Sequence, residues 1–240
     1  MSYTIEKRLM SGLPNQALTA LKYVIAHESG NPNNCGPNAL ENEIAYMNRN
    51  KANAFTSHWV GGGGKIVQVA PVGKLQYGCG YKGNPLSYAQ VELARTNDKG
   101  QFKKDYAAYI WLLRELAKEA CIPVVLDGTG NGIKSHRWIT DNLKGTTHRD
   151  PYSYLASKGI TEEQFKKDIL NGLDKPQQTE KDDDTMKFTN ETTKAAVRDY
   201  IKQAVDKKLI DKSHLDKFDA GTLTGGDFEG LKIIIAQRSN

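Results

Sequence analysis

The feature that most constrains the fold is a polar segment in the last third of the chain. Residues 174–184 are all polar, charged or proline, and none of them has an apolar side chain that a core could bury. A segment of this composition stays solvated and connects folded units. We therefore predict a main domain at residues 1–172, an acidic linker at 173–185 and a small C-terminal unit at 186–240.

The overall composition indicates a soluble globular protein. Hydrophobic residues make up 38% of the 240 residues and charged residues 25%. No apolar run approaches the roughly 20 residues of a membrane span, so we expect no stable membrane insertion. Residues 1–8 lack the apolar core of a signal peptide, which predicts synthesis in the cytosol. The net charge of +5 is only mildly basic and no nucleic-acid-binding motif accompanies it, so we expect no nucleic-acid partner.

Short β-prone runs alternate with helical patterns along the main domain. Strands are predicted at residues 21–26, 55–60, 65–69 and 88–94, with a further extended segment at 122–126. Helices are predicted at residues 39–49, 102–120 and 161–170. Gly61–Gly64 is a turn between two strands, not a phosphate-binding loop, because no Lys-Ser/Thr pair or helix follows it. The alternation predicts an α/β fold with a mixed central sheet flanked by helices.

Three polar residues near the middle of the chain, His136, His148 and Asp150, are candidate zinc ligands. A further histidine, His27, ends an apolar run at the point where α/β sheets present ligands. Zinc is bound by nitrogen and oxygen ligands brought to one point, and a catalytic site keeps one position for water. The sequence has no HExxH motif and no CxxC pair. From the spacing alone, these residues could form a metal site, or the histidines could be scattered and unrelated to one another.

The C-terminal unit has a clear helical pattern. Four apolar residues recur at every fourth position, namely Val197, Ile201, Val205 and Leu209. We predict a small all-α unit of two or three short helices, of which the last covers residues 228–237. A unit of this size buries little apolar surface alone, which favours docking or self-association. The apolar run Ile233–Ile235 is too wide for one core-facing stripe and is a candidate for contact with a second chain.

Seven short segments of the main domain, taken in order, resemble the zinc amidases of the peptidoglycan-recognition fold. The resemblance is strongest to phage endolysins of the N-acetylmuramoyl-L-alanine amidase type. The matching segments are residues 23–27, 41–47, 57–60 with 66–68, 77–80, 91–93, 136–138 and 148–151. The chain departs from the family pattern at Gln90, where a glycine is expected, and in a longer gap between His136 and Asp150.

The resemblance implies one zinc ion per chain, held by His27, His136 and Asp150. It also implies that Glu92 takes a proton from water and that His148, beside the metal, assists catalysis. The substrate contacts that it implies are His58, Tyr46, Trp59 and Tyr77. For His58, packing within the strand pair is the alternative role. His148 remains the alternative third ligand.

The function implied is that of an endolysin, which cleaves the amide bond between N-acetylmuramic acid and L-alanine in peptidoglycan and lyses the bacterial host. Two alternatives remain open: an inactive recognition module on the same fold, and a zinc peptidase that cuts within the stem peptide. An endolysin would accumulate in the host cytoplasm and reach the wall through a separate membrane pore. Residues 186–240 would bind the wall or form a homo-oligomer, with a shorter product starting at Met186 as a further expectation.

Overall fold

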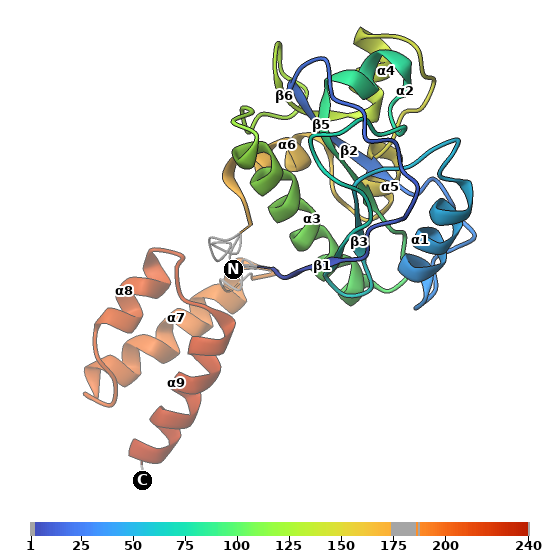
Figure 1. Cartoon of the computed structure of the whole chain (residues 1–240). Helices are drawn as coiled ribbons and strands as arrows, with labels where there is room; N and C mark the ends of the chain where they lie inside the picture. The colour runs from blue at the N-terminus through green and yellow to red at the C-terminus, as the bar shows by residue number, and fades with distance from the viewer. Residues whose placement is uncertain (1–2, 174–185, 187, 240) are drawn as a thin grey trace. The chain divides into compact units, whose positions relative to one another are not determined.

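The computed structural model describes residues 3–173, 186 and 188–239. The chain divides into two compact units, Met1–Lys175 and Pro176–Asn240 (Figure 1). The first unit contains the predicted main domain and the second contains the predicted C-terminal unit. Residues 174–185 of the predicted linker lie outside the described residues.

A six-stranded sheet forms the centre of the described part of the first unit. Its strands are β1 (Ile5–Lys7), β2 (Tyr23–Glu28), β3 (His58–Gly61), β4 (Lys65–Gln68), β5 (Ser87–Leu93) and β6 (Gly132–Ser135). Their spatial order is β1-β4-β3-β5-β2-β6. The β3–β4 hairpin is antiparallel, whereas the other neighbouring pairs are parallel. The sheet is therefore mixed, as the sequence predicts.

One face of the sheet packs against the long helix α3 (Lys99–Glu119), with α5 (Tyr152–Ser157) and α6 (Glu162–Asn171) completing the layer. Asp98 caps α3 by accepting a hydrogen bond from the Gln101 backbone N–H. The residues that form this core include Val24, Ala26, Val60, Val91, Tyr109, Leu113, Leu155 and Phe165. The largest apolar cluster of the domain thus lies between the sheet and α3.

The opposite face carries shorter helices. Helix α1 (Ala39–Asn50) packs over β3 and β4, where Leu40 and Met47 meet Trp59 and Val67. Helix α2 (Gly80–Gly83), the 3-10 helix η1 (Asn84–Leu86) and helix α4 (His136–Asn142) complete this layer. Ile25, Cys79 and Ile139 form a smaller cluster there. The domain is therefore a three-layer arrangement with the sheet in the middle (Figure 1).

Most predicted elements of the main domain are present within a few residues of their predicted bounds. The exception is residues 122–126, which form no strand in the described structure. There Leu126 makes only an isolated bridge to Ile133. Strand β6 supplies the sheet edge instead and begins at Gly132, where no strand was predicted. The backbone of β6 passes close to Val125 at Gly132. A Cβ atom at residue 132 would lie 2.7 Å from the Val125 carbonyl oxygen, so a glycine suits this position.

The described part of the C-terminal unit is all-α, as predicted. Its helices are α7 (Glu191–Asp206), α8 (Ser213–Asp219) and α9 (Gly225–Arg238). They share a small core that includes Ile201, Ala204, Phe218, Leu223, Leu231 and Ile235. On α9, Ile233 is 61% exposed and Ile234 is 38% exposed. No described helix of the chain has the length and apolar character needed to cross a membrane.

Candidate metal centre

The strand register gathers the predicted site residues on one face of the sheet. Trp59 of β3 pairs with Glu92 of β5, which pairs with His27 of β2. On the far side of β2, Ala26 pairs with Ser135, and His136 follows directly at the start of α4. Paired residues of neighbouring strands point to the same face. Glu92, His27 and His136 therefore lie in one row across the sheet.

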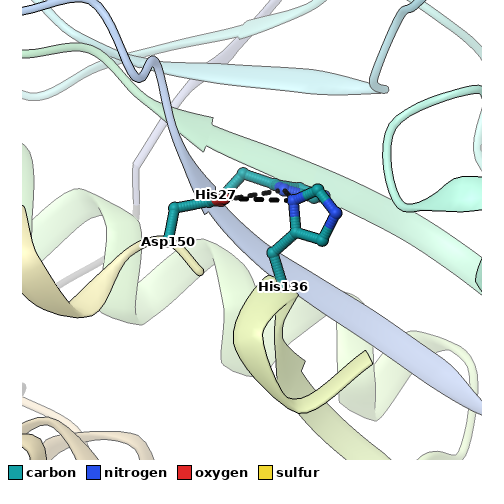
Figure 2. A group of neighbouring side chains, drawn as sticks. All are labelled: His27, His136 and Asp150. Atoms are coloured by element: carbon teal, nitrogen blue, oxygen red, sulfur yellow. Dashed lines mark hydrogen bonds and ion pairs between the residues drawn. The ribbon is translucent and has the colours of Figure 1, made fainter. Parts of the chain in front are cut away.

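His27, His136 and Asp150 form a compact cluster (Figure 2). The Nδ1 atom of His27 lies 3.1 Å from His136 Nδ1 and 3.1 Å from Asp150 Oδ2. His136 Nδ1 lies 3.1 Å from Asp150 Oδ1. Both histidines are buried, and the carboxylate is nearly so. The Arg137 backbone N–H donates to the Asp150 carbonyl oxygen at 3.2 Å and so ties the Asp150 loop to the start of α4.

The cluster fits a zinc ion by geometry and by donor chemistry. A tetrahedral zinc with bonds of about 2.0–2.1 Å holds two ligand atoms about 3.3 Å apart. The two Nδ1 atoms lie 3.1 Å apart, and a different oxygen of the Asp150 carboxylate lies 3.1 Å from each of them. Two imidazole nitrogens and a carboxylate oxygen are ligands that zinc accepts, and catalytic sites use three protein ligands.

The electrostatics of the cluster favour a bound cation. Burial would raise the pKa of Asp150, but the hydrogen bonds from His136 and His27 hold this pKa well below its usual range. Burial lowers the pKa of His136 to about 4, so this imidazole is neutral near pH 7. Burial also acts to lower the pKa of His27, but the Asp150 hydrogen bond and the nearby Glu92 charge outweigh it and raise this pKa. The carboxylate is thus ionised at neutral pH.

The outer nitrogens of both histidines also have hydrogen-bond partners. His27 Nε2 lies 3.1 Å from the side-chain oxygen of Gln90, and His136 Nε2 lies 3.0 Å from Thr146 Oγ1. Such partners orient metal-ligating imidazoles and fix which nitrogen carries the proton. Neither Gln90 nor Thr146 was predicted in this role from the sequence. The only signal was that Gln90 replaces an expected glycine.

Glu92, the predicted proton acceptor, lies beside the cluster and pairs with His27 across the sheet. It is half-buried, and burial raises its pKa to about 8. Its Oε2 atom is enclosed and has no hydrogen-bond partner within the described part of the chain. A carboxyl group with a pKa raised toward the operating pH suits proton transfer.

His148 lies at the rim of the cluster. Its side chain is 71% exposed, and its Nδ1 atom is 3.9 Å from Asp150 Oδ1. Its ring stacks on that of His136 with 4.9 Å between the centroids. Of the two candidate third ligands, Asp150 is the one whose oxygens lie within 3.1 Å of both buried histidines.

The four predicted substrate contacts lie in different environments. Tyr46 is 59% exposed on α1, and Tyr77 is half-buried with its ring against Phe55. Trp59 is buried, and its indole N–H donates to the Met47 sulfur at 3.3 Å. His58 is buried as well, and burial lowers its pKa to about 4.

The register explains the position of His58. It pairs with Val91, which belongs to the core under α3, so the imidazole faces away from His27 and His136. Its Nδ1 atom lies 3.0 Å from Ser57 Oγ. These contacts support the alternative role of His58, packing within the strand pair. Since neither His58 nor Trp59 offers an exposed surface, we retain only Tyr46 and Tyr77 as candidate substrate contacts.

A mixed sheet that carries a His-His-Asp cluster with a carboxylate beside it is the arrangement of an α/β metallohydrolase. The N-acetylmuramoyl-L-alanine amidase family, Amidase_2, matches residues 17–153, which is more than half of the chain, and the chain belongs to this family. The matched range contains all three residues of the cluster and Glu92.

Relatives from bacteriophages match about 70% of the chain. An endolysin of Listeria phage A511 is 49% identical over 173 residues, which cover 70% of this chain and 50% of that protein. A lytic amidase of Streptococcus pneumoniae phage HB-3 is 43% identical over 171 residues, which cover 69% of this chain and 52% of that protein. The chain thus spans about half the length of these relatives.

Solved structures share the fold. The crystal structure of the Staphylococcus aureus hydrolase AmiA in complex with its ligand has a TM-score of 0.64 and 25% sequence identity, and the match covers 71% of this chain and 83% of that one. A mutant endolysin from Bacillus subtilis has a TM-score of 0.53 at 19% identity, covering 70% of this chain and 99% of that one. The three-layer arrangement is therefore the fold of known hydrolases and endolysins.

Proposed function

We propose that the main domain is a zinc-dependent amidase that hydrolyses the bond between N-acetylmuramic acid and L-alanine in bacterial peptidoglycan. The observation that carries this proposal is the 3.1 Å cluster of His27, His136 and Asp150, with Glu92 beside it, in a member of the amidase family. The phage relatives named endolysin and lytic amidase support a role in lysing the bacterial host.

One zinc ion held by His27, His136 and Asp150 would act as a Lewis acid that polarises the scissile carbonyl. It would also lower the pKa of water toward about 7. In its ionised form, Glu92 accepts a proton from the attacking water and passes it to the departing amine nitrogen of L-alanine. The products are the carboxylate of the lactyl group and a free amino terminus. His148, at the rim, donates a hydrogen bond to the carbonyl oxygen as negative charge develops on it.

Tyr46 and Tyr77 are the proposed substrate contacts. A tyrosine presents a flat apolar ring and a hydroxyl, which suits the faces and hydroxyl groups of sugars. Tyr46 projects from α1 on the same side of the sheet as the cluster and is exposed. We expect Tyr46→Ala to raise KM while kcat stays near the wild-type value.

Digestion of purified cell walls, followed by mass analysis of the released ends, tests the reaction. We expect new L-alanine amino termini and no new reducing sugar ends. Reducing ends would indicate a glycosidase, and cuts within the stem peptide would favour the zinc peptidase alternative. An inactive recognition module would release neither; the presence of all three proposed ligands and Glu92 argues against it.

We also propose roles for the C-terminal unit. The unit would bind the wall or assemble the enzyme through the exposed Ile233 and Ile234 of α9. Met186 already packs in its core and donates its backbone N–H to the Leu223 carbonyl oxygen at 3.1 Å, so a shorter product starting there would keep this contact. Expression of Met186→Leu beside the wild type tests the shorter product. Passage from the host cytoplasm through a separate pore likewise stays a prediction.

A further inference from the structure

Gln90 is a fully buried glutamine in β5 whose side chain lies beside the proposed metal ligand His27. Its Oε1 atom is 3.1 Å from His27 Nε2, and its Nε2 atom is 3.3 Å from Asn84 Oδ1. The two ends of one amide group therefore contact two different polar side chains. A buried amide in this position is costly unless both ends are paired, which restricts its orientation.

The backbone N–H of Cys79 fixes the direction of the hydrogen bonds that link Asn84, Gln90 and His27. The N–H of Cys79 can only donate, and it lies 2.8 Å from the side chain of Asn84. The Asn84 atom that faces it must therefore be the oxygen. This oxygen also faces Gln90, so the end of Gln90 that meets it must be the NH₂ group.

The same reasoning extends to His27. With its NH₂ group directed at Asn84, Gln90 presents its oxygen to His27 Nε2, and this nitrogen must carry a proton. The lone pair of the neutral imidazole then lies on Nδ1, the atom that faces His136 and Asp150. The Cys79 backbone N–H, acting through the buried side-chain amides of Asn84 and Gln90, therefore leaves the Nδ1 atom of His27 as the one that can bind a metal.

We propose that Gln90 is a positioning residue that fixes the tautomer and ring orientation of His27 for zinc. The inference rests on the proposed zinc site and deepens it, since it assigns a role to a residue that contacts neither the metal nor the substrate. Hydrogen-bond partners of this kind typically change metal affinity by about 10–100-fold.

Gly78 makes room for this arrangement. A Cβ atom at residue 78 would lie 2.3 Å from Gln90 Oε1 and 2.8 Å from Thr56 Cγ2. The first of these contacts would displace the same oxygen that holds His27. A glutamine at residue 90 therefore requires a glycine at residue 78, because its side-chain oxygen leaves no space there for a Cβ atom.

The test compares Gln90→Met with Gln76→Met in the full chain. Methionine keeps the volume of glutamine and removes the acceptor. Gln76 is also fully buried, but its amide bonds only backbone groups, those of Lys74, Tyr88 and Gln90. Zinc affinity is measured by competition with a chelator, without substrate. We expect about 10–100-fold weaker binding for Gln90→Met and a change under threefold for Gln76→Met.

A spectroscopic readout separates positioning from loss of stability. In zinc-loaded wild type, the His27 Nε2 proton should give an NMR signal that exchanges slowly with water, and Gln90→Met should lose this protection. Gln90→Leu also removes the acceptor and gives a second variant if the methionine variant does not fold; it too should bind zinc about 10–100-fold more weakly than the wild type. Gly78→Ala should weaken zinc binding, and much less so in a Gln90→Ala background.

Each outcome bears on a distinct claim. Equal zinc affinity and an equally protected His27 proton in wild type and Gln90→Met would overturn the role of Gln90 while the amidase proposal stands. Zinc binding by the wild type without release of L-alanine termini would overturn the proposed reaction and leave the role of Gln90 intact. A wild-type chain that takes up no zinc would overturn both.

Discussion

Asp150 carries the negative charge of the cluster, and His148 lies just outside it. We expect Asp150→Ala to weaken zinc binding by more than about 100-fold and to abolish wall lysis, because two buried imidazoles lose their anionic partner. His148→Ala should retain zinc and lose activity. Metal analysis of both purified variants checks this. Zinc loss from His148→Ala together with zinc retention by Asp150→Ala would make His148 the third ligand.

Glu92 should matter for turnover and not for metal binding. We expect Glu92→Gln to keep the fold and the zinc while kcat falls by about 10²–10⁴-fold, since the amide cannot accept the proton. The release of L-alanine termini over time, measured at saturating wall fragments, gives kcat. Turnover near the wild-type rate would exclude Glu92 as the proton acceptor.

The raised pKa of Glu92 also predicts a pH-dependent stability change. Its folded-state pKa of about 8 lies above the ordinary value of 4.5, so the carboxyl group costs stability increasingly as the pH rises from 4.5 to 8. In zinc-free protein, Glu92→Gln should therefore gain about 1–3 kcal/mol relative to wild type between pH 5 and pH 8. Thermal unfolding in chelator at both pH values measures it, with the exposed Glu163→Gln as control. A constant difference would contradict the prediction.

Individual site residues differ in how far the sequence could predict them. The family resemblance groups His27, His136 and Asp150, whereas their spacing in the sequence alone leaves that grouping open. His58 was assigned to the substrate side from its motif, yet residues alternate between faces along a strand, and only the register with Val91 decides its face. The contact between Gln90 and His27 joins residues 63 positions apart and has no local signal.

At the scale of elements, Asp127 joins the two segments that supply His136 and Asp150. Its carboxylate accepts hydrogen bonds from the Ser135 backbone N–H and hydroxyl, both at 2.7 Å, and from the Tyr152 hydroxyl at 2.6 Å. Ser135 is the N-cap of α4, which begins with His136, and Tyr152 opens α5 after Asp150. This side chain thus adds to the backbone hydrogen bond between Arg137 and Asp150 in holding β6–α4 beside the Asp150 loop.

Removal of this link should affect both stability and metal binding. We expect Asp127→Ala to lower the free energy of unfolding by about 2–4 kcal/mol, because three hydrogen bonds are lost. Zinc affinity should fall by about tenfold as the two segments move apart. Chemical denaturation and chelator competition measure these effects. The control is Glu115→Ala, which removes an exposed carboxylate paired with Lys118 within α3; equal effects of both variants would contradict the assignment.

Elements with a long or regular pattern were predictable, and short ones at the sheet edge were not. Helix α3 has an apolar stripe over many turns, and β5 alternates clearly. Strand β6 is four residues long and starts at Gly132, among glycines that favour a loop. Its extended conformation depends on pairing with β2, which no local pattern encodes.

At the scale of the whole molecule, every proposed site residue of the amidase lies in the first unit. We expect residues 1–173 alone to bind zinc and to cleave soluble wall fragments with a kcat close to that of the full chain. Binding to intact walls should be weaker without the second unit. Sedimentation with purified walls and fragment digestion check the two halves of this prediction. A truncated protein that fails to bind zinc would show that the two units depend on each other.

The cluster joins His27 to His136, 109 positions away, and to Asp150, 123 positions away. A metal ion bound there acts as a cross-link that closes most of the main domain into one loop. Contacts between such distant residues form late in folding, so metal capture should report a completed domain and not a partial one. Because zinc would bind the native state and not the unfolded chain, the free energy of binding adds to the free energy of unfolding. Bound zinc would then raise the free energy of unfolding of the main domain by an amount that grows with the concentration of free zinc.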